Sequence, residues 1–325
     1  GPAAGVIGTQ ALCQALGIEN AIAFDMGGTT AKAGVVRHHQ ALVANSVMIG
    51  GTVGEVVDSR HAKFAPGDRV VGMGGWQDFS VVDANELGLL RKVDTTHVPL
   101  SHYLGAVGMP GVTAWHGLVR IIEPQAGQTV TVSAASGAVG SAVGALAKAR
   151  GARAVGIAGG ADKCRYVTEE LGFDACIDYK AHPDAASLGK ALKQACPQGI
   201  DGYFENVGGD VTRAVAPLLN PGARVPICGY VSNYNDEDMA SAITPFHILK
   251  ELDNVPEHRF FVVTEWHAQW VEATKQLGAW IKEGKIKYRE SIGEGIENAP
   301  ELFRGMLKGR NFGKQLVRVA DETVG

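Results

Sequence analysis

A glycine-rich run near the middle of the chain has the spacing of a dinucleotide-binding turn. The run Ala135-Ser136-Gly137-Ala138-Val139-Gly140 follows the pattern GxGxxG, with alanine in the first place. Glycines at this spacing allow a tight turn and bring bare backbone up to the cofactor pyrophosphate, and the next helix directs its N-terminus at the negative charge. Gly144, one turn further on, would allow close helix–strand packing. The alternative is a glycine-rich turn that serves only packing.

A second pair of glycines indicates which cofactor this turn would take. Sites that prefer NAD usually place an acidic residue at the end of the second strand, where it holds the ribose 2′-hydroxyl. Here that strand ends in Gly159-Gly160, which leaves room for a 2′-phosphate, and Lys163 and Arg165 follow closely enough to pair with it. Asp162 is ambiguous, since it also fits a helix N-cap, and Lys163 could be a solvated surface charge. NADP(H) is therefore favoured over NAD(H).

The elements around these residues predict the fold that positions them. Short apolar strands alternate with helices of about three turns, which indicates a parallel sheet with right-handed crossovers. Strands are expected at 130–135, 154–158, 175–179, 201–206 and 224–228, and helices at 143–149, 162–171, 185–195 and 211–219. The fold class is therefore α/β, with a Rossmann-type doubly wound parallel sheet.

The flanking segments contribute further elements. Downstream we expect helices at 245–252, 266–282 and 299–307 and strands at 260–263, 287–292 and 315–319. Upstream, strands at 51–57, 69–72 and 78–82 would form a small antiparallel unit, and residues 20–36 a β-hairpin around Gly27-Gly28.

Composition and charge exclude several classes of partner. The chain has 325 residues, 46% hydrophobic and 20% charged, with a net charge of −4, so there is no electrostatic reason to expect nucleic acid or an anionic membrane. No apolar run reaches the roughly 20 residues that span a bilayer, and residues 1–4 lack the features of a signal peptide.

The five cysteines form no CxxC and accompany no histidine cluster, so we expect no metal site. Their expected role is as buried apolar thiols in a reducing cytoplasm. The cysteines are Cys13, Cys164, Cys176, Cys196 and Cys228.

Several motifs, taken in order, resemble a known family over about residues 47–320. The matching stretches are 50–54 (GGTVG), 74–78 (GGWQD), 108–114 (GMPGVTA), 134–140 (AASGAVG), 156–160 (GIAGG), 205–209 (ENVGG), 228–229 (CG), 234–235 (YN) and 311–314 (NFGK). They resemble the zinc-independent medium-chain dehydrogenases/reductases that include prostaglandin reductases, curcumin reductase and alkenal double-bond reductases. The resemblance implies NADPH-dependent reduction of the C=C bond of α,β-unsaturated aldehydes and ketones, with hydride passing to the β-carbon. It also suggests a homodimer.

The same resemblance implies roles for individual residues. Lys163 and Tyr179 would hold the 2′-phosphate, and Met109 and Thr113 would lie by the nicotinamide. Residues 261–263 would offer backbone groups to the carboxamide, and Tyr234 would donate a hydrogen bond or a proton to the enolate, the alternative being an ordinary loop tyrosine. The expected cofactor-binding residues are Met109, Thr113, Ser136, Gly137, Ala138, Val139, Gly140, Gly159, Lys163, Tyr179, Asn206, Cys228, Tyr234, Phe261, Val263 and Asn311.

Departures from the family leave alternatives open. The sequence lacks the family's Asp-Pro-Tyr-Met-Arg segment, so we expect a truncated GroES-like β-barrel domain at 47–107 and 285–325, beside a Rossmann domain at 108–284. Phe260 stands where the family has a glycine, which affects the carboxamide contact. The alternative to an active reductase is accordingly an NADPH-binding protein with impaired catalysis.

Residues 1–46 are expected to be a separate fragment or fusion segment. The stretches 1–8 (GPAAGVIG) and 24–32 (FDMGGTTAK) resemble the hydantoinase A/oxoprolinase family, over about residues 1–36. The resemblance implies that Asp25 would organise a metal or a water molecule and that the Gly-Gly-Thr turn would offer N–H donors to phosphate. An ATPase-linked hydantoinase fragment is therefore a third hypothesis, although no second phosphate loop or adenosine pocket accompanies the motif.

Overall fold

The computed structural model divides the chain into two compact units. It describes residues 51–82, 90–233 and 242–320, and the backbone of three strands between residues 20 and 42. The first unit comprises residues 1–96, 294–299 and 317–325, and the second, here called the α/β unit, comprises 97–293 and 300–316. The domain limits expected at 46, 107 and 284 stay predictions.

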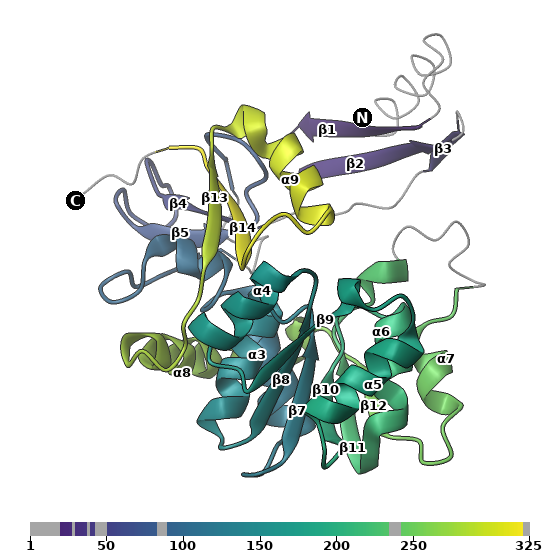
Figure 1. The fold of residues 1–325 in the computed structure, drawn as a ribbon. Coiled ribbons are helices and arrows are strands. Elements are labelled where there is room, and N and C mark those ends of the chain that lie inside the picture. Colours follow the sequence, from purple (N-terminus) through teal and green to yellow (C-terminus); the bar gives the residue numbers. More distant parts are fainter. Residues whose placement is uncertain are drawn as a thin grey trace. The chain divides into compact units, whose positions relative to one another are not determined.

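The α/β unit is built on one six-stranded parallel sheet (Figure 1). Its strands are β7 (Thr129–Ser133), β8 (Arg153–Ala158), β9 (Ala175–Asp178), β10 (Ile200–Phe204), β11 (Leu219–Ile227) and β12 (Glu257–Phe260). They lie in the order β12-β11-β10-β7-β8-β9. The order of the strands therefore reverses between β7 and β10, with β8 and β9 on one side of β7 and β10, β11 and β12 on the other. All five residues of β7 are buried, as expected for a strand covered on both faces. The doubly wound parallel sheet predicted from the sequence is confirmed.

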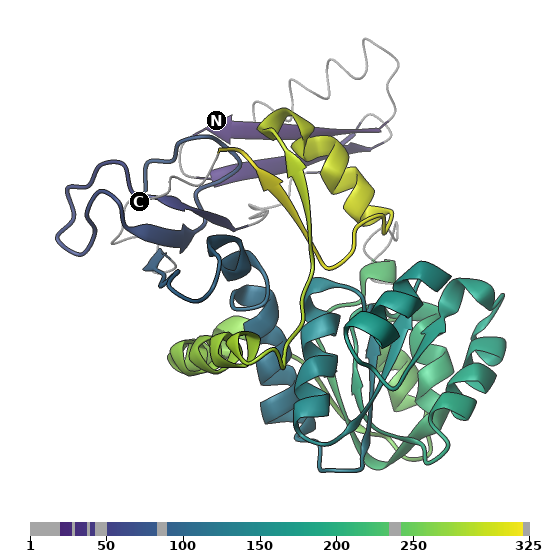
Figure 2. The same ribbon diagram turned by 60° about the vertical axis from the view of Figure 1, so that its left-hand side comes forward.

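Helices cover both faces of this sheet (Figure 2). One face carries α2 (Met109–His116), α3 (Ala138–Ala149) and α4 (Ala161–Arg165), and the other carries α5 (Ala185–Ala195), α6 (Gly209–Val215) and α7 (Pro245–Lys250). On the second face Leu188 and Leu192 of α5 pack with Val211 of α6 and Ile248 of α7 in one buried cluster. The side chain of Asp184 caps α5 by accepting a hydrogen bond of 2.7 Å from the N–H of Ser187. This local signal explains why α5 begins at the predicted residue.

Short helical turns extend several of these helices. They are η1 (Leu100–Leu104), the π-helical turns η2 (Gly117–Ile122) and η3 (Tyr166–Glu170), η4 (Tyr179–Ala181), η5 (Ala216–Leu218), η6 (Val231–Asn233), η7 (Val263–Gln269) and η8 (Ile296–Asn298). The helix predicted at 266–282 is divided: Trp266 has the non-helical angles φ −110° and ψ 35°, and the regular helix α8 covers Trp270–Lys282. Helix α9 (Ala299–Leu307) has its predicted limits.

Two strand predictions are wrong. The strand expected at 260–263 ends at Phe260, because β12 pairs with β11 only through residues 257–260 and the chain then turns into η7. No strand forms at 78–82, because the chain bends at residues 76–78 and is irregular after them. There the carbonyl of Gly74 accepts hydrogen bonds from the side chains of Gln77 (2.6 Å) and Ser80 (2.7 Å). Side-chain bonds of this kind favour a turn over a strand.

The remaining strands are short. In the first unit β4 (Thr52–Glu55), β5 (Arg69–Gly72) and β6 (Arg91–Lys92) form an antiparallel sheet. Strands β1 (Asn20–Gly27), β2 (Thr30–Arg37) and β3 (Gln40–Leu42) form another, and the Gly27–Thr30 pairing confirms the predicted hairpin. Strand β13 (Glu290–Glu294) pairs with β14 (Lys314–Arg318). Among the described residues, no helix combines the length and apolar character needed to cross a membrane.

Candidate functional site

The carboxyl ends of the six parallel strands carry most of the residues predicted to bind the cofactor. In a parallel sheet these ends meet at one edge, and ligands bind there near the point where the strand order reverses. The residues that follow the strands are Ser136 to Gly140 after β7, Gly159 and Lys163 after β8, Tyr179 after β9, Asn206 after β10, Cys228 after β11, and Phe261 and Val263 after β12. All of them lie in the α/β unit.

The glycine-rich turn between β7 and α3 has a strained backbone and an open helix start. Ala134 adopts φ +52°, a left-handed conformation that is uncommon for a residue with a side chain. Gly137 occupies the N-cap position of α3 and supplies no side-chain cap. A Cβ on Gly140 would lie 2.4 Å from the carbonyl oxygen of Ala134, so the turn requires glycine there. The first N–H groups of α3 therefore have no capping side chain and suit a phosphate group.

At Gly144, helix α3 packs against the side chain of Phe173 rather than against a strand. A Cβ on Gly144 would lie 1.8 Å from Cζ of Phe173, so the phenyl ring occupies the space that a side chain would need. Phe173 is 4% exposed and lies just before β9.

The groups predicted to hold the 2′-phosphate lie just after β8 and just after β9. A Cβ on Gly159 would lie 2.8 Å from the ring of Tyr179, so the absence of a side chain lets the phenol lie against this backbone. Oδ1 of Asp178 accepts a hydrogen bond of 2.7 Å from the N–H of Gly160 and thereby ties the two strand ends together. The N-cap alternative for Asp162 is wrong, because Gly160 is the N-cap of α4 and Asp162 forms an ion pair with Arg165.

Lys163 contacts a loop from near the end of the chain. Its Nζ donates a hydrogen bond of 2.7 Å to the carbonyl of Gly309 and lies 5.7 Å from the ring centroid of Phe312. Burial, and then the charge of Lys180, lower the pKa of the Lys163 ammonium. An anion placed beside this ammonium would oppose both effects, since it favours the charged form.

The loop 309–313 also contacts the glycine-rich turn. The N–H of Gly313 donates 2.8 Å to the carbonyl of Ser136, and a parallel bridge joins Gly313 to Gly137. The amide of Asn311 donates 2.8 Å to the carbonyl of Gly313, which stabilises the loop at this contact. Gly313 has φ +62°, and a Cβ there would lie 1.9 Å from the carbonyl oxygen of Arg289. The predicted residue Asn311 thus belongs to a loop that contacts Ser136 and Gly137 through Gly313.

A fully buried carboxylate that was not predicted from the sequence, Glu205, stabilises the loop after β10. Oε1 of Glu205 accepts hydrogen bonds from the N–H groups of Val207 (2.8 Å) and Gly208 (3.0 Å) and from the hydroxyl of Ser133 (3.1 Å). Oε2 accepts one from the hydroxyl of Thr212. Glu205 is 0% exposed. Its position in an apolar strand before a Val-Gly-Gly turn was the available signal, because a buried carboxylate needs such donors.

Asn206 lies directly beside this network. Its backbone N–H donates 2.8 Å to the hydroxyl of Ser133, and its side-chain amide donates 2.8 Å to the carbonyl of the same residue. Asn206 is therefore fixed to the end of β7, next to the start of the glycine-rich turn.

The predicted residues after β11 and β12 are buried or already bonded within the protein. Burial raises the pKa of the Cys228 thiol to about 11. The N–H of Phe261 donates 3.3 Å to the carbonyl of Ile227, so this donor is already bonded within the sheet. Phe261 and Val263 are buried, at 3% and 7% exposure.

Met109 and Thr113 lie on α2. Met109 begins the helix and is 45% exposed, whereas Thr113 is buried and its hydroxyl donates 2.7 Å to the carbonyl of Met109. Tyr234, predicted to act on the enolate, lies outside the described residues.

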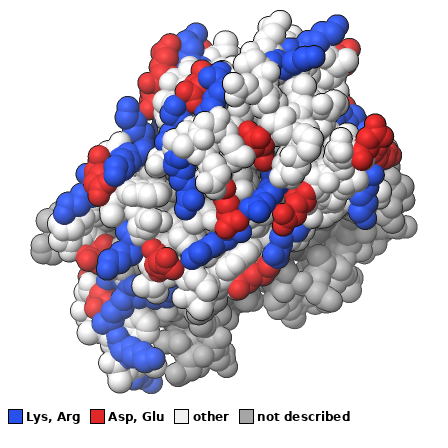
Figure 3. Space-filling view, turned by 90° about the horizontal axis from the view of Figure 1, so that it is seen from below, with Lys and Arg blue, Asp and Glu red and all other residues white. Residues whose placement is uncertain are grey.

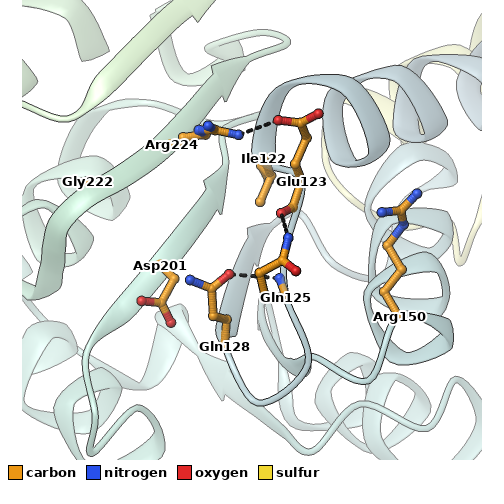
Figure 4. A pocket seen from close by; sticks show the side chains of 8 residues that line it. All are labelled: Ile122, Glu123, Gln125, Gln128, Arg150, Asp201, Gly222 and Arg224. Atoms are coloured by element: carbon orange, nitrogen blue, oxygen red, sulfur yellow. Dashed lines mark hydrogen bonds and ion pairs between the residues drawn. The ribbon is translucent and has the colours of Figure 1, made fainter.

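A polar cavity lies at the opposite side of the sheet, where the strands begin, and none of the predicted residues line it. It has a volume of about 430 Å³ and lies near the amino ends of β7 and β10 (Figure 4). Arg224 donates 2.6 Å to Glu123, and Gln128 accepts 2.8 Å from the N–H of Gln125, so these groups bond to one another. The lining residues are Ile122, Glu123, Gln125, Gln128, Arg150, Asp201, Gly222 and Arg224. We therefore place the candidate site at the carboxyl edge.

Neither the surface charge nor the possible metal ligands help to locate the candidate site. On the face shown in Figure 3, positive and negative side chains of the described residues are interspersed. Within the described residues, no group of three or more His, Cys, Asp or Glu side chains could hold a metal ion.

The fold and the site define a class of protein, and two family models match the chain. One, described as zinc-binding dehydrogenase, matches residues 138–277, and the other, the N-terminal domain of oxidoreductase, matches residues 32–90. The fold is that of the medium-chain dehydrogenases/reductases, which combine a Rossmann-type sheet with an N-terminal GroES-like domain. The second match begins before residue 47, where the sequence alone placed the start of this domain.

Similar proteins and structures identify the branch of this class. The chain is 45% identical to NADPH-dependent curcumin reductase of Escherichia coli, over 85% of this chain and 79% of that protein. It is 41% identical to prostaglandin reductase 1 of Sus scrofa (85% and 83%) and 38% identical to a 2-alkenal reductase (NADP(+)-dependent) of Nicotiana tabacum (87% and 80%). The crystal structure of CurA from Vibrio vulnificus in complex with NADPH is 41% identical, with a TM-score of 0.76 over 86% of this chain and 82% of that one. The chain belongs to the prostaglandin reductase, curcumin reductase and alkenal reductase family.

Proposed function

We propose that this chain uses NADPH to reduce the C=C bond of α,β-unsaturated aldehydes and ketones. The observation that carries the proposal is the carboxyl edge of the sheet. There, the uncapped start of α3 follows a turn that requires glycine at Gly140, and the Tyr179 ring lies against Gly159 at the ends of β8 and β9, with Lys163 on the helix that follows β8. Relatives with NADPH-dependent reductase names at 38% to 45% identity support the same assignment.

The residues of the chain would bind and orient the reactants. The open N–H groups of α3 would receive the pyrophosphate, and Lys163 and Tyr179 would hold the 2′-phosphate. The cofactor supplies a hydride for the β-carbon of the substrate. The protein then has to align the reactants and stabilise the negative charge on the carbonyl oxygen. We propose Tyr234 as the hydrogen-bond donor to that oxygen, after which the α-carbon takes up a proton.

Nicotinamide absorbance, followed with a simple enone as substrate, tests this function. We expect oxidation of NADPH that depends on the enone. Replacing Lys163 by alanine should weaken NADPH binding about 10-fold to 100-fold, the equivalent of one charge-assisted contact of about 1.5–3 kcal/mol, and leave NADH binding unchanged. Binding without oxidation by any enone or enal would contradict the reductase and support an NADPH-binding protein with impaired catalysis.

We also propose that the chain forms a homodimer. Strand β12 lies at one edge of the sheet. Phe260, its last residue, and Val262, two residues beyond it, are 46% and 47% exposed. An edge strand has unpaired backbone groups that can pair with a second copy, and the two exposed apolar side chains would add to such a contact. Sedimentation of the purified chain tests the proposal, and a monomer at micromolar concentration would contradict it. The cytoplasmic location stays a prediction.

A further inference from the structure

Two cysteine thiols lie in contact beside the region proposed to hold the 2′-phosphate. Cys164 lies on α4 and Cys176 on β9, and their Sγ atoms are 3.3 Å apart, with the Cys176 thiol donating to Cys164. Both residues are partly exposed. They are twelve residues apart in the sequence, which is why no CxxC pattern marked them.

The fold itself brings the two sulfur atoms together. Cys176 packs above Gly156 of β8, where a Cβ would lie 3.2 Å from its Sγ and 2.9 Å from Val167. The missing side chain at Gly156 lets the thiol lie between the sheet and the segment formed by α4 and η3. A disulfide bond is about 2.05 Å long, so the sulfur atoms would have to approach by about 1.2 Å.

The pair has a nucleophilic and a resolving member. The hydrogen bond from Cys176 lowers the pKa of the Cys164 thiol, although burial and Asp178 oppose this effect. The same hydrogen bond, together with burial, raises the pKa of Cys176. Because the thiolate is the attacking species in disulfide exchange, Cys164 is the expected first nucleophile.

We propose that Cys164 and Cys176 form a redox-active dithiol that reacts with small disulfides such as oxidised glutathione and thereby controls binding of the cofactor 2′-phosphate. The Cys164 thiolate attacks one sulfur of the small disulfide, forms a mixed disulfide and releases one thiolate. Cys176 then loses its proton to solvent and attacks Sγ of Cys164, which releases the second thiolate. The two protein thiols are oxidised to one disulfide, and one small disulfide is reduced to two thiols.

The link to the cofactor rests on the proposed function and on the neighbours of the two cysteines. Lys163 precedes Cys164 directly, and Tyr179 follows Cys176 by three residues. Closing the disulfide would draw α4 toward β9 and displace Lys163 relative to Tyr179. Loss of one charge-assisted contact should weaken NADPH binding about 10-fold to 100-fold, whereas NADH, which has no 2′-phosphate, should bind as before.

The experiment uses the full chain, first reduced and then incubated with oxidised glutathione. Mass spectrometry of the intact chain and of its peptides should show the loss of two hydrogen atoms and a link between Cys164 and Cys176. NADPH and NADH affinities are measured before and after oxidation and after re-reduction by dithiothreitol. Cys164→Ser and Cys176→Ser should each abolish the link and the affinity change. Cys196→Ala, which removes a thiol that is 1% exposed, is the matched control and should preserve both.

Each result decides one part of the proposal. A glutathione adduct that persists on Cys164 without the link to Cys176 would overturn the dithiol. A link that leaves the ratio of NADPH to NADH affinity unchanged would overturn the control of cofactor binding. If the reduced chain binds no NADPH at all although the link forms, the proposed function and the control of cofactor binding both fail, while the dithiol stands.

Discussion

Replacing Glu205 by alanine should destabilise the α/β unit by about 3–5 kcal/mol. The carboxylate is fully buried and accepts hydrogen bonds from Ser133, Val207, Gly208 and Thr212. The hydroxyls of Ser133 and Thr212 can rotate toward other acceptors, but the two backbone N–H groups cannot. Each buried N–H left without a partner costs about 1–3 kcal/mol, and the lost side chain adds a cavity. Relief of the carboxylate's own desolvation offsets part of this cost.

Glu205→Gln refines the same prediction. Glutamine keeps one oxygen for the N–H groups of Val207 and Gly208, and its amide can donate to the Thr212 hydroxyl, which can act as acceptor. We therefore expect a loss of about 1 kcal/mol, well below that of the alanine variant. The exposed Glu169, replaced by alanine, is the control and should change stability by less than about 0.5 kcal/mol.

Urea unfolding and hydrogen exchange measure the effect. The free energy of unfolding comes from linear extrapolation to water. Exchange of the Val207 and Gly208 amides reports the loop directly and should be faster in Glu205→Ala. A loss below about 1 kcal/mol for alanine, or an equal loss for glutamine and alanine, would refute the argument that satisfied hydrogen bonds make this carboxylate stabilising.

Two further predictions concern stability. Gly278→Ala should stabilise helix α8 by about 0.5–1 kcal/mol, because its Cβ would meet only an ordinary contact at 3.6 Å, whereas Gly140→Ala should cost about 1–3 kcal/mol through its clash with Ala134. Urea unfolding of both variants checks this, and a loss of stability for Gly278→Ala would contradict it. His116 is fully buried, and burial lowers its pKa from 6.5 to about 4, so the unfolded chain binds a proton that the folded chain does not as the pH falls between these values. Stability should therefore fall by up to about 3 kcal/mol over that range, and unfolding curves of His116→Phe should lack this contribution; an unchanged pH dependence would rule it out.

The sequence by itself determined the features that depend on neighbouring residues. The order of strands and helices from β7 to β11 follows from local apolar patterns, and the start of α5 follows from the cap at Asp184. The glycine-rich turn was also predictable, because the need for glycine at Gly140 comes from Ala134, only six residues away. Local conformational requirements of this kind are written in short stretches of sequence.

Only the tertiary structure decided which distant groups meet at the site. Glu205 reaches Ser133 because β10 lies next to β7, and Gly313 reaches Ser136 because the chain returns from its far end. Cys164 and Cys176 approach because α4 packs over the neighbouring strand. Sequence spacing does not encode such contacts, because they depend on how crossovers stack the strands and on which side chains the packing leaves room for.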